Sequence, residues 1–188
     1  MPGVDDQTVA RDEWPSGLGV RPERPRDYAS VSDVVVMAFG SEQEARLVER
    51  IRESPEYLAE LSLVAEMDGQ VIGHVMISHA LIREENTEHR VAILAPLAVT
   101  PEFHGRGIGS ALVRRVTAEA DDRGEPVVIL EGSPVFYGRL GFEYSVPYGI
   151  HISLPSWAPP EAAQVLRLCN YKASIRGQVV YPAAFDLG

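Results

Sequence analysis

Apolar side chains in the first third of the chain recur every three or four residues, a spacing that predicts helices. Segment 25–39 opens on a proline, which suits the first turn of a helix, and a short strand over 18–22 precedes it. Segment 41–54 opens on Ser41 with Glu44 three residues later, which predicts a capping box. The apolar stripes comprise Tyr28, Val31, Val35 and Ala38 or Phe39 in the first helix, and Leu47, Val48 and Ile51 in the second.

The pattern then changes to alternation and to longer apolar runs, which are typical of strands. Segments 61–67 and 70–82 flank Asp68-Gly69, a dipeptide typical of tight hairpin turns, so they should pair antiparallel. After a polar turn, segment 89–100 is more apolar, as expected of a central strand. Pro96 lies within it and cannot donate to a strand ladder, so we expect a bulge there, with the sheet opening beside it.

The second half of the chain alternates between helical and strand patterns. We expect helices over 109–124 and 133–141, the latter capped by Ser133, and strands over 126–132, 142–146 and 163–171. The resulting order of elements predicts an α/β (α+β) fold, in which a mixed sheet carries helices on both faces.

Length and composition narrow the class of protein. The chain has 188 residues, enough for a single domain with its own core, which we expect over 18–188 after a flexible tail over 1–17. Its 17 basic and 27 acidic residues give a net charge of −10, which argues against a nucleic-acid partner. Cys169 is the only cysteine and the histidines lack metal-ligand spacing, so we expect neither a disulfide nor a metal site. Without a signal-peptide pattern or a membrane-length apolar run, we expect a cytoplasmic protein with no membrane partner.

Three glycines, Gly105, Gly107 and Gly109, alternate with other residues between an apolar strand and an amphipathic helix. Glycine weakens regular elements, so the cluster suggests a function such as phosphate binding at a helix N-terminus. A P-loop is excluded because no Gly-Lys pair occurs, and a dinucleotide-binding fingerprint fails because its last position is Ser110 or Leu112. Two interpretations remain: a pyrophosphate held by free N–H groups of the loop, or a tight turn without a ligand.

Segments LAVTPEFHGRGIGSALV (97–113) and FYGRLGFEY (136–144) together resemble the GNAT superfamily of N-acetyltransferases. The first carries the family's Gln/Arg-x-x-Gly-x-Gly/Ala motif, with His104 in place of Gln or Arg, and the second carries its Tyr-x-x-x-Gly-Phe motif. The resemblance covers roughly residues 18 to 188. It implies a mixed, mostly antiparallel sheet that splits into a V between its fourth and fifth strands.

The resemblance also implies acetyl-CoA as a cosubstrate. In such enzymes the pantetheine arm pairs with the splayed fourth strand like an added strand, and the pyrophosphate lies on the glycine loop. The matching cofactor positions are Leu97, Ala98, Val99, His104, Gly105, Arg106, Gly107, Ile108, Gly109 and Ser110. Tyr137 matches the family's general acid, which protonates the departing thiolate.

Acetyl transfer to an amine further requires a neutral amine and a donor for the thioester oxygen. We expect the backbone N–H of Val99 to be this donor, and Glu131, which ends strand 126–132, to accept the amine proton through water. The acceptor pocket should lie between the first two helices and the loop 148–157.

The leading hypothesis is an acetyl-CoA-dependent N-acetyltransferase that acts on a primary amine of a small molecule or peptide by direct attack on the thioester. Two alternatives stay open. One is a catalytically silent CoA-binding sensor or structural module with the same fold, and the other is a Rossmann-type nucleotide binder, which the failed fingerprint disfavours. The expected partner is the amine substrate, and a homodimer is left open.

Overall fold

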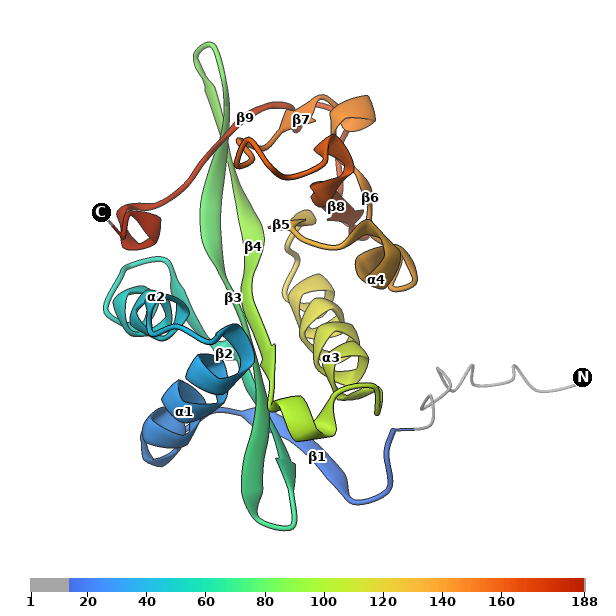
Figure 1. Cartoon of the computed structure of the whole chain (residues 1–188). Coiled ribbons are helices and arrows are strands. Elements are labelled where there is room, and N and C mark those ends of the chain that lie inside the picture. The colour runs from blue at the N-terminus through green and yellow to red at the C-terminus, as the bar shows by residue number, and fades with distance from the viewer. Residues whose placement is uncertain (1–13, 188) are drawn as a thin grey trace, which may run out of the picture.

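The fold is built on one mixed sheet, seen in a computed structural model that describes residues 14–187 (Figure 1). Neighbouring strands pair antiparallel, except for the β4–β5 and β7–β9 pairs, which are parallel. The strands are β1 (Leu18–Pro22), β2 (Tyr57–Met67), β3 (Gln70–Glu84), β4 (Thr87–Val99), β5 (Val127–Glu131), β6 (Glu143–Tyr144), β7 (Ile150–His151), β8 (Ala163–Arg167) and β9 (Gly177–Val180). The helices are α1 (Tyr28–Phe39), α2 (Gln43–Arg52), α3 (Ile108–Asp122) and α4 (Pro134–Gly138). The predicted fold class is therefore confirmed.

The β2–β3 hairpin forms around Asp68-Gly69, as its sequence predicts. Both turn residues have positive φ, 52° at Asp68 and 77° at Gly69, as a two-residue hairpin turn of the primed type requires. Met67 pairs with Gln70 directly beside the turn. Both strands are longer than predicted, because β2 already begins at Tyr57 and β3 extends to Glu84.

The sheet splits between β4 and β5. The two strands pair only at Ala92↔Val128 and Ile93↔Ile129, after which β4 continues without β5 beside it. The register of β4 against β3 shifts at this point, so that Ala95 and Pro96 form a bulge opposite a single residue of β3. The bulge at Pro96 and the opening beside it confirm the prediction.

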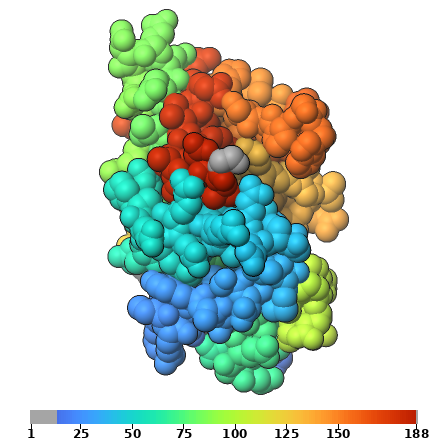
Figure 2. Space-filling view, turned by 60° about the vertical axis from the view of Figure 1, so that its left-hand side comes forward, coloured from blue at the N-terminus to red at the C-terminus, as the bar shows by residue number. Residues whose placement is uncertain are grey.

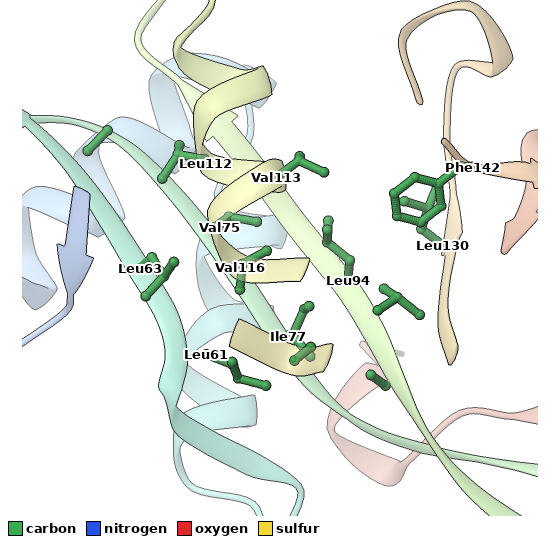
Figure 3. Packing of buried hydrophobic residues seen from close by; sticks show 14 of the residues in the cluster. Leu61, Leu63, Val75, Ile77, Leu94, Leu112, Val113, Val116, Leu130 and Phe142 are labelled. Atoms are coloured by element: carbon green, nitrogen blue, oxygen red, sulfur yellow. The ribbon is translucent and has the colours of Figure 1, made fainter. Parts of the chain in front are cut away.

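Helices cover both faces of the sheet, with α1 and α2 on one side and α3 on the other (Figure 1). Strand alternation explains this, because Leu63 of β2 packs toward α3 while its neighbour Val64 packs toward α1 and α2. Figure 3 shows Leu112 and Val116 of α3 directed at the sheet residues that surround Leu63. Each fully buried aliphatic side chain of this kind contributes about 1.5–3 kcal/mol to folding.

The start of α2 differs from the prediction. The helix begins at Gln43, and Glu42 stands at the cap position without a side-chain capping bond. Ser41 instead donates its hydroxyl to the Glu44 carboxylate over 2.5 Å and accepts the Gln43 N–H over 3.3 Å. The predicted capping box is therefore wrong, because the Glu44 side chain binds a side-chain hydroxyl instead of a backbone N–H. The predicted cap of α4 is confirmed, since Ser133 accepts the N–H of Phe136.

The C-terminal region contains a strand that the sequence pattern did not predict. β9 pairs antiparallel with β3, and Leu81 lies opposite Val180. It uses the same edge of β3 as β2, which pairs with the earlier part of that strand. The chain then crosses to the face of the sheet that α1 and α2 cover, where Arg50 of α2 donates a hydrogen bond to the carbonyl of Ala183 over 2.8 Å. Figure 2 shows this C-terminal segment, in red, lying directly beside the α2 region.

A buried polar cluster joins α2 to the sheet, and sequence patterns did not indicate it. Glu23 follows β1, and its carboxylate binds Arg52 at the end of α2 over 2.6 Å. Ser62 of β2 donates to Glu23 over 2.7 Å and accepts from Nε2 of His74 over 3.1 Å. Burial lowers the pKa of His74, and its Nδ1 has no partner among the described residues. A neutral ring fits both facts, because Nδ1 then carries a lone pair and no proton.

Residues 1–13, most of the predicted tail, lie outside the described residues. Immediately before β1, the N–H of Leu18 donates to the carbonyl of Pro15 over 3.0 Å, so the chain turns into the sheet there. No helix within residues 14–187 is long and apolar enough to cross a membrane.

Candidate active site

The glycine loop leads into the N-terminus of α3. Gly105 and Gly107 have φ values of 73° and 79°, in the left-handed region that costs a residue with a Cβ roughly 1–2 kcal/mol. At both positions a Cβ would meet no described atom within 4 Å. Glycine is therefore required by the backbone conformation, and the surface over the loop is open to a ligand.

Several backbone N–H groups at this helix N-terminus have no partner within the helix. The first helical hydrogen bond runs from Ala111 N–H to the carbonyl of Gly107 over 3.0 Å, so the N–H groups of Ile108, Gly109 and Ser110 precede it. The positive end of the helix dipole adds to their attraction for an anion. Arg106, which is exposed and lies 5.1 Å over the Phe103 ring, brings a full positive charge to the same loop.

The edge of β4 that faces the split carries backbone groups that no neighbouring strand within residues 14–187 pairs. Thr100 donates its N–H to Ile72 of β3 over 2.9 Å. Since successive residues of an antiparallel strand point their N–H and C=O groups to opposite sides, Ala98 faces β3, whereas Leu97 and Val99 face away from it. β5 pairs with β4 only as far as Ile93, so it does not cover this edge.

His104 binds this same edge. Its Nε2 lies 2.7 Å from the carbonyl oxygen of Val99, which makes Nε2 the protonated nitrogen and the carbonyl the acceptor. The side chain that replaces the family's Gln or Arg therefore links the glycine loop to β4.

The two sequence motifs meet in space. A Cβ at Gly109 would lie 3.5 Å from the Phe136 ring and 3.8 Å from the side chains of Leu97 and Val99. The start of α3, the end of β4 and helix α4 therefore lie next to one another around Gly109. The two motifs are far apart in the sequence, so only the family resemblance predicted that they would meet.

A cavity of about 390 Å³ lies beside this meeting point. It is lined by the end of α1, by α2, by β4 around its bulge, by the end of β5, by α4 and by the C-terminal segment. The lining residues are Phe39, Glu44, Leu47, Ile93, Leu94, Ala95, Pro96, Leu97, Glu131, Gly132, Tyr137, Tyr181 and Phe185.

Tyr137 presents its ring to this cavity from α4. The ring packs edge-on against Phe136 and Phe142, with centroids 4.8 Å and 5.5 Å away, and a Cβ at Gly132 would overlap it. Burial raises the pKa of Tyr137 to about 12, so the phenol is protonated throughout the neutral range. No side chain within residues 14–187 binds the hydroxyl, which leaves it available to a group in the cavity.

Glu131 ends β5 in the same cavity and is held by a residue from the far end of the chain. Tyr181, which follows β9, donates its hydroxyl to the Glu131 carboxylate in a short hydrogen bond. Burial, and then this bond, raise the pKa of Tyr181 well above its ordinary value, so the phenol remains the donor.

The lining of the cavity agrees only in part with the acceptor pocket that the sequence predicts. The junction of α1 and α2 does contribute, through Phe39, Glu44 and Leu47. The loop 148–157 does not line the cavity, and Tyr148 instead binds Glu143 over 2.6 Å. Its predicted place is taken by the C-terminal segment, which carried no motif and was missed for that reason. Among residues 14–187, no group of three or more His, Cys, Asp or Glu side chains is arranged to hold a metal ion.

The chain is similar in sequence to known N-acetyltransferases. The chain is 31% identical over 169 residues to the uncharacterized N-acetyltransferase YhbS of Escherichia coli, covering 89% of this chain and 98% of YhbS. It is 34% identical over 131 residues to the uncharacterized N-acetyltransferase YjhQ of the same organism, covering 66% and 72% of the two chains.

Solved structures show the same fold. The crystal structure of YhbS in complex with CoA matches with a TM-score of 0.78 and 30% identity, covering 90% of this chain and 92% of that one. A GNAT family acetyltransferase from Brucella melitensis in complex with acetyl-CoA matches with a TM-score of 0.72 and 31% identity, covering 90% and 98%. The family model for the acetyltransferase (GNAT) domain matches residues 19–145. The chain therefore belongs to the GNAT family of acetyltransferases.

Proposed function

We propose that this protein is an acetyl-CoA-dependent N-acetyltransferase that transfers an acetyl group to a primary amine of a small molecule or peptide. The observation that carries the proposal is the cavity that Tyr137 and Glu131 line together with β4 around its bulge. The glycine loop at the N-terminus of α3 lies next to that strand.

The residues present fit acetyl-CoA. The C=O of Leu97 and the N–H of Val99 would pair with the pantetheine amides in the manner of an added strand, because both groups face the split. The free N–H groups of Ile108, Gly109 and Ser110 would hold the pyrophosphate, with Arg106 adding charge. His104 would then act by fixing the Val99 carbonyl, and not as a direct phosphate ligand. The related structures from E. coli and Brucella melitensis contain CoA and acetyl-CoA.

The chemistry is direct transfer. The amine nitrogen attacks the thioester carbonyl, the new C–N bond forms, and the C–S bond breaks. Glu131 takes the proton that the amine must lose, through a water molecule, and Tyr137 gives a proton to the departing thiolate. Because burial raises the pKa of Tyr137 to about 12, the phenol keeps its proton throughout the neutral range until the thiolate takes it.

Negative charge develops on the thioester oxygen during attack and needs a donor. Val99 was the sequence candidate. The N–H of Leu97 faces the same way, and Leu97, unlike Val99, lines the cavity that holds Tyr137 and Glu131. We therefore assign Leu97 as the oxyanion donor and Val99 as a pantetheine contact.

The test is an assay of CoA release across a library of primary amines, together with acetyl-CoA binding measured by thermal shift. We expect saturable binding, and turnover with at least one amine that yields an N-acetylated product by mass spectrometry. Binding of acetyl-CoA without turnover of any amine would contradict the proposal and favour a CoA-binding sensor.

A further inference from the structure

The charged side chains that line the active-site cavity are all carboxylates. Its lining includes two carboxylates, Glu44 and Glu131, and two phenols, Tyr137 and Tyr181, but no Lys, Arg or His. Within residues 14–187, neither carboxylate is paired with a basic side chain: Glu131 binds Tyr181 and Glu44 binds Ser41. The charged side chains of this lining therefore favour a cation, and among residues 14–187 no basic side chain lines the cavity to neutralise a bound anion.

The rest of the lining is apolar. Phe39, at the end of α1, is 45% exposed although it is a large hydrophobic residue, and its neighbours in the lining include Leu47 of α2. Phe185 extends this surface from the C-terminal segment, with its ring 5.4 Å from that of Tyr181. These side chains offer a bound molecule apolar contact and no hydrogen-bonding groups of their own.

We propose that the acceptor is a small primary amine with an apolar body, an alkylamine or arylalkylamine, and that it carries no carboxylate beside the amine. The proposal rests on the proposed function, because it concerns the acceptor of that same reaction. An α-amino acid would bring its carboxylate into a cavity that already holds two, with no cation to pair with it. An apolar amine avoids this repulsion and buries its hydrocarbon part.

Glu44 is the specificity-determining residue in this arrangement. It lies in the first turn of α2, where the helix dipole favours a negative charge, and the Ser41 hydroxyl fixes its carboxylate over 2.5 Å. Glu131 is reserved for proton transfer, so Glu44 is the carboxylate that can be changed without removing the base. Glu49 is an exposed carboxylate on the same helix that does not line the cavity, and it provides a matched control.

The first experiment compares three acceptors that share one side chain: phenethylamine, phenylalanine and phenylalaninamide. We expect kcat/KM for phenethylamine to exceed that for phenylalanine by at least about tenfold, because phenylalanine brings a third carboxylate beside Glu44 and Glu131 with no basic side chain in the lining to pair with it. Phenylalaninamide restores the bulk of the carboxylate without its charge, and it should resemble phenethylamine. If the enzyme acetylates phenylalanine with a kcat/KM equal to that for phenethylamine, the inference is overturned while the proposed function stays intact.

The second experiment reverses the charge at one position. Glu44→Lys should lower the preference for phenethylamine over phenylalanine by about tenfold or more, whereas Glu49→Lys, which changes the net charge equally, should leave the ratio unchanged. The Kd of each compound for the complex with CoA, measured by calorimetry, should shift in the same direction without any turnover. An unchanged ratio in Glu44→Lys would overturn the role of Glu44. Failure of every amine to react, despite CoA binding, would overturn the proposed function and this inference together.

Discussion

The hydroxyl of Tyr181 donates a hydrogen bond to the carboxylate of Glu131, and this contact joins the segment after β9 to the end of β5 across the open part of the sheet. The two residues are 50 positions apart in the chain. The bond gives the carboxylate a fixed orientation in the cavity, and it makes the C-terminal segment part of the site.

Tyr181→Phe should lower kcat by about tenfold, because a hydrogen bond to a charged group is worth about 1.5–3 kcal/mol and orients the proposed base. This loss is smaller than the roughly 10²–10⁴ expected when a general base is absent, as in Glu131→Gln. The affinity for acetyl-CoA should not change in either variant. Steady-state kinetics with a verified amine measures kcat for the two variants. Equal losses of kcat in Tyr181→Phe and Glu131→Gln would contradict a role for Tyr181 that is limited to positioning Glu131.

Tyr137→Phe should lower kcat by roughly 10²–10⁴ while the CoA affinity and Tm barely change, since phenylalanine keeps the ring and removes only the proton donor. The parent enzyme should remain active to about pH 10 or above, because burial raises the pKa of Tyr137 to about 12 and the acid is lost only as the pH approaches that value. The loss of activity at alkaline pH should therefore occur at a higher pH than an ordinary tyrosine would give.

Tyr148→Phe is the control for this variant, because Tyr148 is also half-buried but binds Glu143 and does not line the cavity. It should have the parent kcat. Parental turnover in Tyr137→Phe would show that this tyrosine serves packing and not proton transfer.

Gly107→Val should abolish the thermal stabilisation that acetyl-CoA produces, because a side chain would project into the space over the loop. It should also destabilise the fold by about 1–2 kcal/mol, since Gly107 has a φ of 79°. Gly69→Val separates the two effects, because Gly69 has a φ of 77° and similarly open surroundings but lies in the β2–β3 hairpin. Calorimetry should find similar losses of stability in both variants, with acetyl-CoA binding retained only in Gly69→Val; binding retained in Gly107→Val would remove the loop from the site.

The stability of the protein should fall on acidification, beginning near the ordinary pKa of histidine. Burial lowers the pKa of His74 below 6.5, so below about that pH the unfolded chain binds a proton that the folded protein does not. Burial by itself raises the pKa of Glu23, but hydrogen bonds with His74, Arg52 and Ser62 outweigh it and hold the pKa well below 4.5. Glu23 therefore stabilises the fold above about that pH, and this contribution is lost as the pH falls further.

Tm measured across this range should decline first through His74 and then more steeply through Glu23. His74→Gln should remove the first decline and weaken the second without abolishing it, because Arg52 and Ser62 still bind Glu23. His151→Gln, at an exposed position, should change neither. A Tm that is constant from about pH 7 to about pH 4 would contradict the assignment.

Much of the local structure was predictable because its signals are local. The hairpin at Asp68-Gly69, the bulge at Pro96 and the Ser133 cap each depend on the conformational preferences of a few adjacent residues. The glycine loop was recognised as a candidate anion site from the same kind of chemistry. Its assignment to acetyl-CoA needed the family resemblance, because glycine spacing alone does not name the ligand.

The sequence by itself determined which segments form the main helices and the central strands, because propensity and periodicity act over one or two turns of chain. It did not determine their ends, since β2 already begins at Tyr57 and α2 begins only at Gln43. Only the tertiary structure decided that Tyr181 and Phe185 complete the cavity, that Glu44 faces it, and that Glu23 meets Arg52 and His74 beneath α2. These contacts depend on how the short strand β9 registers against β3 and on how α2 docks on the sheet. A strand of four residues carries little periodicity, and long-range pairing follows from the burial of the whole core, so no nearby residue could indicate them.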